Sequence, residues 1–269
     1  MKQPAVTLFW LVILGGVINY YITVSYVTRE TEEQIKQSYT EYLTGEKAST
    51  LGERQDAFNR ALALYTGFER DYSPKNSTGK LYYNIANSYY QVGEHSWAAL
   101  YYYRAQKLMP RSDKVVHSLE MSLKKLGIVP KEEEIMFRKT FPFHYLLSLP
   151  ERLQLFSGLT FFAIVVGSFY IWKRKRWLKK IAILATILAS VMLLSLGYSH
   201  YLAAVEGVLV KSTALYRDAG LQYAKVTKEP ILSGNKVEIL DVLDEGKWLK
   251  IETPEGDLGY VPQEAIRII

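Results

Sequence analysis

The stretch GKLYYNIANSYYQVGEHSWAALYYYRAQKLMP, Gly79–Pro110, decides the fold of the helical part of this chain. Its spacing predicts a helix over Lys80–Val92, a turn at Gly93–Glu94 and a second helix that ends before Pro110. Small residues recur where the two helices must approach closely, and large side chains fill the space between them. We therefore expect two antiparallel helices that share one core.

The pattern resembles a tetratricopeptide repeat, a helix–turn–helix unit of about 34 residues. Nine residues match the signature of that repeat in register: Tyr82, Ile85, Ala86, Tyr89, Gly93, Ala98, Tyr102, Ala105 and Pro110. A weaker copy precedes it, in which Gly52 and Ala57 are spaced like Gly93 and Ala98. One amphipathic helix follows, with an expected apolar face of Val116, Leu119, Leu123 and Leu126. The resemblance implies an all-α solenoid of tetratricopeptide repeats over residues 29–130.

In that repeat family the first helices line a concave groove, so the resemblance also implies a partner-binding surface. By register, its residues are Lys80, Tyr83, Asn84, Asn87, Tyr90 and Gln91. Asn87 matches the position that hydrogen-bonds a ligand backbone or carboxylate in peptide-binding members. The lysine that completes the carboxylate clamp is replaced by Tyr83. The alternative is that these residues are simply solvated.

Three long uncharged runs predict membrane segments, because about 20 apolar residues in a helix cross roughly 30 Å of hydrocarbon. Two of them, residues 153–172 and 181–205, predict a pair of transmembrane helices. The first, within residues 1–28, predicts an N-terminal anchor, with a cleaved signal peptide as the rival interpretation. Residues 131–152 combine prolines with aromatic residues and are expected to form a linker at the membrane interface.

The segment KRKRWLKK, residues 173–180, lies between the second and third runs and has six basic residues in eight positions. The whole chain has 33 basic and 27 acidic residues, so this segment accounts for the net charge of +6.

Short loops rich in Lys and Arg stay in the cytoplasm. We therefore expect a multi-pass protein of the bacterial inner membrane, with residues 29–152 and 206–269 in the periplasm. The residues expected to set topology and contact lipid headgroups are Lys173, Arg174, Lys175, Arg176, Lys179 and Lys180. A nucleic-acid partner is not expected, because the remaining charge is balanced.

From residue 206 to residue 269 the pattern changes to short alternating segments, which predicts a small all-β barrel. Strands are expected at Val237–Val242, Lys247–Glu252 and Leu258–Pro262. The segment resembles a bacterial SH3 domain in its turn glycine Gly234, in Trp248, in Gly259–Tyr260–Val261 and in a final turn at Gln263–Ala265. The first strand of that family would correspond to Leu215–Gly220, where only Leu215 and Arg217 match.

Four residues of this segment could form an aromatic surface for a proline-rich, extended or cell-wall peptide. They are Tyr216, Trp248, Tyr260 and Pro262. The alternative is that Trp248 fills the core of the barrel.

Enzyme signatures are missing from the sequence. It contains no cysteine, no Gly-rich phosphate loop, no HExxH and no Gly-x-Ser-x-Gly motif. The four histidines, His95, His117, His144 and His200, have no spacing typical of metal ligands. We expect no catalytic residue, no cofactor and no metal, although an active site assembled only by the fold remains an alternative.

The order of segments, more than any one of them, is similar to the BatE family of the Bacteroides aerotolerance (Bat) operon. This resemblance implies a multidomain membrane protein with membrane-anchored von Willebrand A-domain Bat proteins and BatD as partners, and with a MoxR-type ATPase acting indirectly. It also implies a role in aerotolerance or envelope stress. The sequence thus predicts a membrane-anchored periplasmic adaptor. The alternative is a factor for peptidoglycan binding or morphogenesis that uses the SH3-like domain.

Overall fold

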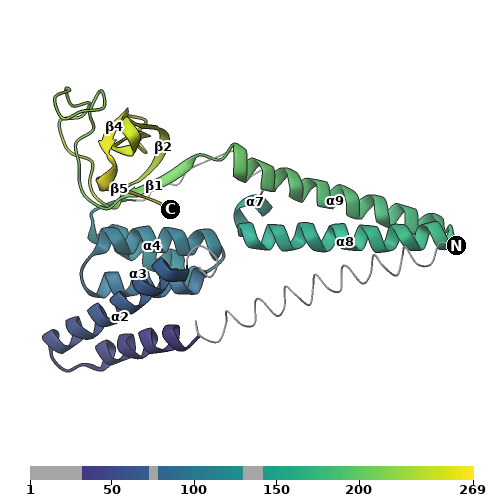
Figure 1. Cartoon of the computed structure of the whole chain (residues 1–269), viewed down its shortest axis with the longest axis horizontal. Coiled ribbons are helices and arrows are strands. Elements are labelled where there is room, and N and C mark those ends of the chain that lie inside the picture. Colours follow the sequence, from purple (N-terminus) through teal and green to yellow (C-terminus); the bar gives the residue numbers. More distant parts are fainter. Residues whose placement is uncertain (1–31, 73–77, 130–141) are drawn as a thin grey trace. The chain divides into compact units, whose positions relative to one another are not determined.

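The computed structural model describes residues 32–72, 78–129 and 142–269. The chain divides into two compact units, Met1–Ser77 and Thr78–Ile269, which are described separately. The described residues are mostly helical, with one small antiparallel sheet (Figure 1). The anchor predicted for residues 1–28 lies outside the described residues, as does the first half, residues 131–141, of the predicted linker 131–152.

The first unit contains a helix over residues 32–47 and helix α2, Leu51–Tyr72. The two helices pack through the rings of Tyr42 and Phe58, whose centroids are 5.1 Å apart. Gly52, which is spaced from Ala57 as Gly93 is from Ala98, lies in the first turn of α2 and not between two helices. The hydroxyl of Thr50 accepts a hydrogen bond from the backbone N–H of Glu53 at 3.3 Å, so α2 is capped before Gly52 is reached.

The second unit begins with the predicted helix pair, α3 (Gly79–Gln91) and α4 (His95–Leu108). The hydroxyl of Thr78 accepts a hydrogen bond from Leu81 N and caps α3. Gly93 has φ +90°, a left-handed conformation that glycine adopts without strain, and it reverses the chain between the helices. The observed bounds agree closely with those expected from the sequence.

Alanines allow α3 and α4 to approach closely, since Ala86, Ala98 and Ala105 are all 0% exposed. Ile85 and Tyr102 fill the space beside them and are buried as well. Helix α5, Asp113–Lys125, follows and packs on α4. The buried apolar face of α5 consists of Val115, Leu119 and Leu123. The expected Val116 is only half-buried, because Val115 takes the position that faces α4.

A helical hairpin comes next, after the short helix α7, Pro142–Leu146. Helices α8 (Leu149–Lys173) and α9 (Arg176–Tyr201) lie side by side (Figure 1). Each is long and apolar enough to cross a membrane, judged by length and composition. Many of their large apolar side chains are exposed.

The predicted basic loop over residues 173–180 is wrong in extent. Only Arg174 and Lys175 lie outside the two helices, with Arg174 in the left-handed conformation at φ 53°. The third apolar run also ends as a helix earlier than expected, at Tyr201. Strand β1, Val205–Leu209, begins four residues later and takes Val205, the last residue of that run.

The sheet contains β1, β2 (Lys236–Leu243), β3 (Trp248–Glu252), β4 (Leu258–Pro262) and β5 (Ile266–Ile268). Its order is β4-β3-β2-β1-β5, and all neighbours are antiparallel. The core of the sheet consists of Leu209, Leu215, Val237, Ile239, Leu249, Ile251, Val261, Ala265 and Ile266. The predicted strands at β2, β3 and β4 are confirmed. Residues 215–220 are not a strand: they belong to a long loop after β1, although Leu215 is fully buried.

Candidate functional site

The best candidate site is a group of aromatic side chains on the outer surface of β3 and β4. Side chains alternate across a strand, so Leu249 and Val261 enter the core while Trp248 and Tyr260 remain outside. Trp248 lies opposite Pro262 in the register of the two strands. Directly paired residues have Cβ atoms about 5 Å apart, so these side chains share one surface.

The long loop after β1 adds Tyr216 to this surface. Tyr216 and Tyr260 exchange backbone hydrogen bonds of 2.9 and 2.8 Å. The ring of Tyr216 lies edge-on to Trp248, with centroids 5.7 Å apart and an interplanar angle of 89°. Gly259 makes this approach possible, because a Cβ there would lie 2.6 Å from Leu215 Cγ and 2.7 Å from the Tyr216 carbonyl oxygen.

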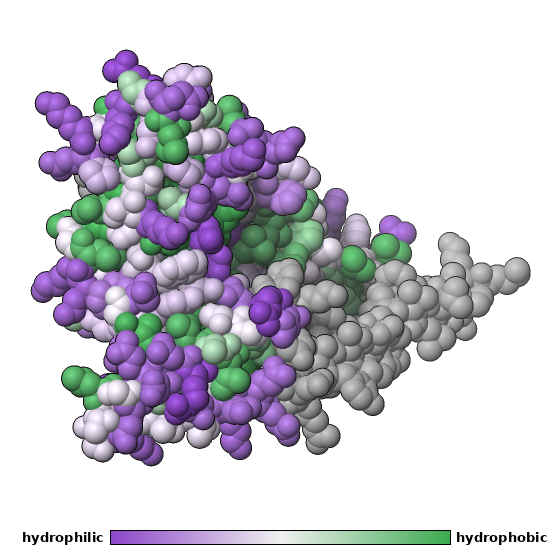
Figure 2. All heavy atoms as spheres, turned by 60° about the vertical axis from the view of Figure 1, so that its left-hand side comes forward, coloured by the Kyte–Doolittle hydropathy of each residue, from purple (hydrophilic) through white to green (hydrophobic). Residues whose placement is uncertain are grey.

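The structure therefore brings together all four residues that the sequence singled out in this domain. We call Tyr216, Trp248, Tyr260 and Pro262 the aromatic shelf; each of them is half-buried. Trp248 is not part of the sheet core, so the interpretation that it fills the core is wrong. Lys250 lies opposite Tyr260 and supplies a positive charge beside the shelf. The upper part of Figure 2, over the β-sheet, shows hydrophobic side chains scattered among hydrophilic ones.

The residues expected to line a repeat groove are split between internal packing and solvent. Lys80 and Gln91 are exposed. Tyr83 packs on the ring of Tyr102, with centroids 5.9 Å apart. The hydroxyl of Tyr102 donates to Asn87 Oδ1 at 2.7 Å, so this oxygen is engaged within the helix pair.

Two further groove candidates, Asn84 and Tyr90, are half-buried. Tyr90 packs on the imidazole of His95, with ring centroids 5.0 Å apart. Lys80, Asn84, Asn87 and Gln91 follow the spacing of one helix face. This face of α3 is thus mixed in character, and only its two ends are well exposed.

All six predicted basic residues at the hairpin turn are exposed: Lys173, Arg174, Lys175, Arg176, Lys179 and Lys180. Three of them begin α9, where the helix dipole disfavours positive charge. Helix stability therefore does not account for Arg176, Lys179 and Lys180. Trp172 and Trp177 flank the turn and are 72% and 59% exposed, and the Lys173 ammonium lies 4.3 Å from the centroid of the Trp172 ring.

Sequence reasoning missed a connection between α4 and the sheet, centred on Glu206 of β1. Its carboxylate pairs with Lys236 at 2.6 Å and with Lys107 of α4 at 3.2 Å. Burial works to raise the pKa of Glu206, but the two lysines outweigh it and hold the pKa below its ordinary value. Residues from three elements meet here, so no local pattern could have indicated this contact.

Sequence reasoning also missed a polar cluster in which His144 contacts the hydroxyl of Ser195, with Nδ1 and Oγ 2.9 Å apart. The guanidinium of Arg152 reaches the same nitrogen at 2.9 Å and occupies the position that would take a serine proton. Burial lowers the pKa of His144, and the charge of Arg152 lowers it further. The cluster therefore lacks the arrangement of a serine nucleophile with its base.

Within residues 32–72, 78–129 and 142–269, no group of three or more His, Cys, Asp or Glu side chains could hold a metal ion. A scan against protein-family models and a search of curated proteins each gave no match to this chain. Inferences about function therefore rest on the sequence and the geometry of the chain itself.

Proposed function

We propose that this protein is a membrane-anchored adaptor of the bacterial inner membrane, which binds a peptide segment of a partner on the aromatic shelf. The observation that carries the proposal is the shelf, where three aromatic rings and a proline gather outside the core of a small sheet. Rings that are half-buried present apolar area at a low entropic cost, as aromatic anchors do in recognition sites.

The β-sheet would be an SH3-like domain, and helices α3 to α5 would belong to a tetratricopeptide-repeat domain. The sequence pattern of Gly79–Pro110 and the packed helix pair support the second assignment. The exposed ends of the α3 face, Lys80 and Gln91, would then offer a second and weaker contact. Two modest sites on one anchored chain raise each other's effective concentration, so neither needs high affinity.

The hairpin α8–α9 would span the membrane with its basic turn in the cytoplasm and both soluble domains in the periplasm. Its length and exposed apolar side chains support this placement. The basic residues support the orientation, because they are retained on the cytoplasmic side. The partners would be membrane proteins of a Bat-type complex, in line with the resemblance to the BatE family.

The test is co-purification of full-length protein with its partners from membranes. We expect Trp248→Ala to weaken capture about 10-fold or more, since a central aromatic anchor contributes about 2 kcal/mol. The matched control is Tyr223→Ala, which removes an exposed tyrosine from the loop outside the shelf. Equal capture by both variants would contradict a binding role for the shelf.

A second candidate function, cell-wall binding, uses the same shelf and is separated by the ligand. Purified sacculi would sediment full-length protein in detergent, and Trp248→Ala would abolish that sedimentation. If sacculi sediment the protein, and if Trp248→Ala leaves its co-purification with protein partners unchanged, cell-wall binding is favoured over the adaptor function.

A further inference from the structure

Arg152, the fourth residue of α8, is buried to 5% exposure at the end of the hairpin opposite the basic turn. Its Nη1 lies 2.8 Å from Ser199 Oγ, 2.9 Å from Ser195 Oγ and 2.9 Å from His144 Nδ1. It also donates to the Ser195 carbonyl oxygen at 3.2 Å. These acceptors are neutral, so the charge of the guanidinium is not compensated by them.

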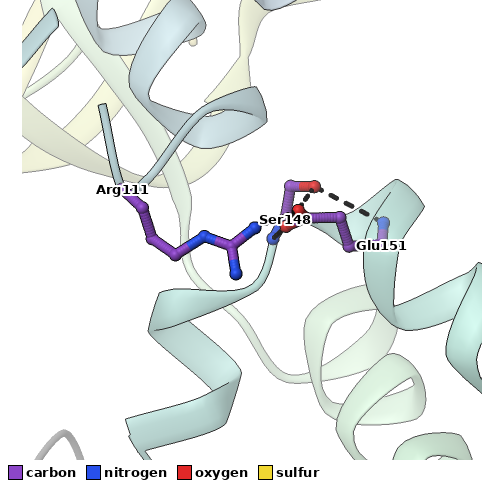
Figure 3. A network of polar contacts seen from close by, with 3 residues as sticks. All are labelled: Arg111, Ser148 and Glu151. Atoms are coloured by element: carbon purple, nitrogen blue, oxygen red, sulfur yellow. Dashed lines mark hydrogen bonds and ion pairs between the residues drawn. The ribbon is translucent and has the colours of Figure 1, made fainter. Parts of the chain in front are cut away.

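The carboxylate of the neighbouring residue Glu151 is directed toward Ser148 and Arg111 (Figure 3). Its Oε2 accepts hydrogen bonds from the backbone N–H of Ser148 at 2.8 Å and from the Ser148 hydroxyl at 3.0 Å, and its Oε1 pairs with Arg111. Across the described parts of the chain, no ion pair includes Arg152. A buried cation without an acid is costly, and it calls for an anion from outside the chain.

One edge of the guanidinium is available for such an anion. Nε is buried and has no hydrogen-bond partner within the described residues, and no bond is formed by Nη2 there. The N–H groups of Nε and Nη2 point in parallel and form a fork that matches two oxygens of a phosphate or carboxylate. Because Nε is buried, binding of the ligand requires a local rearrangement that uncovers it.

The position of Arg152 along the hairpin selects a phosphate at a membrane surface. Between Arg152 and Lys173 the helix advances 21 residues, or about 32 Å at 1.5 Å per residue, close to the thickness of the hydrocarbon layer. With the basic turn at one surface, Arg152 lies at the headgroup level of the other. Leu149, Leu153 and Leu155 around it are 49%, 51% and 44% exposed and suit contact with lipid chains.

We propose that the cluster of Arg152, His144, Ser195 and Ser199 is a phospholipid site, in which the Nε–Nη2 edge of Arg152 holds the headgroup phosphate. The inference rests on the membrane-spanning hairpin of the proposed function. The serines and His144 hold Nη1 and thereby orient the free edge of the guanidinium. Free inorganic phosphate offers the same chemistry, so the experiment has to distinguish the two sources.

The test is solid-state NMR on ¹⁵N-labelled full-length protein, in which ³¹P dephasing of the Arg152 Nε signal reports a nearby phosphorus. The signal is identified by its loss in Arg152→Lys. In phospholipid bilayers we expect strong dephasing, and in phosphate-free galactolipid bilayers none. The control signal is Arg104, whose guanidinium donates to the Ile268 carbonyl oxygen, and it should not be dephased in either bilayer.

Three outcomes would overturn the proposal. Absence of dephasing in phospholipid would remove the site, even with the chain inserted. Dephasing in galactolipid after addition of inorganic phosphate would assign the site to the free ion. Release of the chain from either bilayer by alkaline carbonate would reject both the membrane-spanning hairpin and this site. The first outcome, in contrast, rejects the site and leaves the hairpin.

A second measurement does not depend on the NMR assignment. Native mass spectrometry of detergent-solubilised protein should find one tightly retained phospholipid, and Arg152→Gln should lose it. Arg104→Gln is the matched control and should retain it. Circular dichroism of each variant checks that the helices persist, and retention of the lipid by a folded Arg152→Gln variant would count against the site.

Discussion

At the scale of single residues, the aromatic shelf depends on Gly259 more than on any of its rings. The Tyr216 backbone can pair with β4 only because position 259 has no side chain. The position of Tyr216 in the shelf therefore requires that residue 259 has no Cβ atom.

We expect Gly259→Ala to destabilise the protein by about 1–3 kcal/mol, since the added carbon meets backbone at 2.7 Å as well as the Leu215 side chain. Chemical denaturation followed by Trp fluorescence measures the change. The control is Gly67→Ala in α2, where a Cβ meets nothing within 4 Å and helix propensity should stabilise by about 0.5–1 kcal/mol. Equal stability of both variants would mean that the loop does not pack as described.

Two histidines make stability depend on pH in the same direction. Burial lowers the pKa of His144 from its ordinary 6.5, with Arg152 adding to the effect. Burial and then Lys125 lower the pKa of His95, against an opposing effect of Glu94. The unfolded chain therefore takes up protons at a higher pH than the folded chain, so stability is lost as the pH falls below about 6.5.

Thermal unfolding in detergent at pH 7.5 and pH 5.5 measures this, and we expect the lower melting temperature at pH 5.5. In His95→Gln/His144→Gln the difference should shrink, whereas His117→Gln, at an exposed position, should leave it unchanged. A pH dependence that persists undiminished in the double variant would place its source elsewhere.

At the scale of elements, Glu206 connects strand β1 to helix α4 through two lysines. We expect Glu206→Gln to cost about 1–2 kcal/mol, because charge-assisted hydrogen bonds are lost and Lys107 and Lys236 remain side by side. Hydrogen exchange of β1 amides measures the local effect. The control, Asp244→Asn, removes a 3.6 Å pair whose side chains are 70% and 56% exposed and should change stability by less than about 0.5 kcal/mol. Faster β1 exchange in the control alone would refute the connection.

An element could be predicted when the interactions that form it are local in the sequence. The helices α3 and α4 and the strands β2 to β4 carry their own periodicity, turns and caps, so local reasoning located them. The start of β1 could not be located, because Val205 continues an apolar run and only pairing with β2 makes it a strand. The turn between α8 and α9 was predicted too long, because lysine and arginine are good helix formers, which extend both helices into the basic segment.

The candidate sites divide in the same way. The sequence singled out Trp248 and Tyr260 but left open whether Trp248 fills the core, and the observed strand register shows that both side chains lie outside it. The Arg152 cluster combines His144 and Arg152, which are 8 positions apart, with serines of α9 that lie 43 or more positions further along the chain, so no spacing in the sequence indicates it. The one local signal was the spacing of Ser195 and Ser199, one turn apart within an apolar run.

At the scale of the whole molecule, the proposed topology can be tested because the chain contains no cysteine. Single cysteines at the exposed positions Lys175, Glu120 and Lys228 probe the turn, the helical part and the sheet domain. A membrane-impermeant maleimide should label Glu120→Cys and Lys228→Cys in intact spheroplasts, and Lys175→Cys only after lysis. The cysteine-free parent is the control, and labelling of Lys175→Cys before lysis would reverse the orientation.

The pairing of Tyr216 with Tyr260 has one more consequence, which concerns aggregation. Strand β4 is the last strand on its side of the sheet, and an uncovered edge strand invites pairing between molecules. The loop that supplies Tyr216 occupies part of that edge with two backbone hydrogen bonds. Substitutions that detach the loop should therefore lower solubility as well as capture of the proposed ligand. Substitutions of the shelf side chains alone should leave solubility unchanged, because the loop backbone still covers the edge of β4.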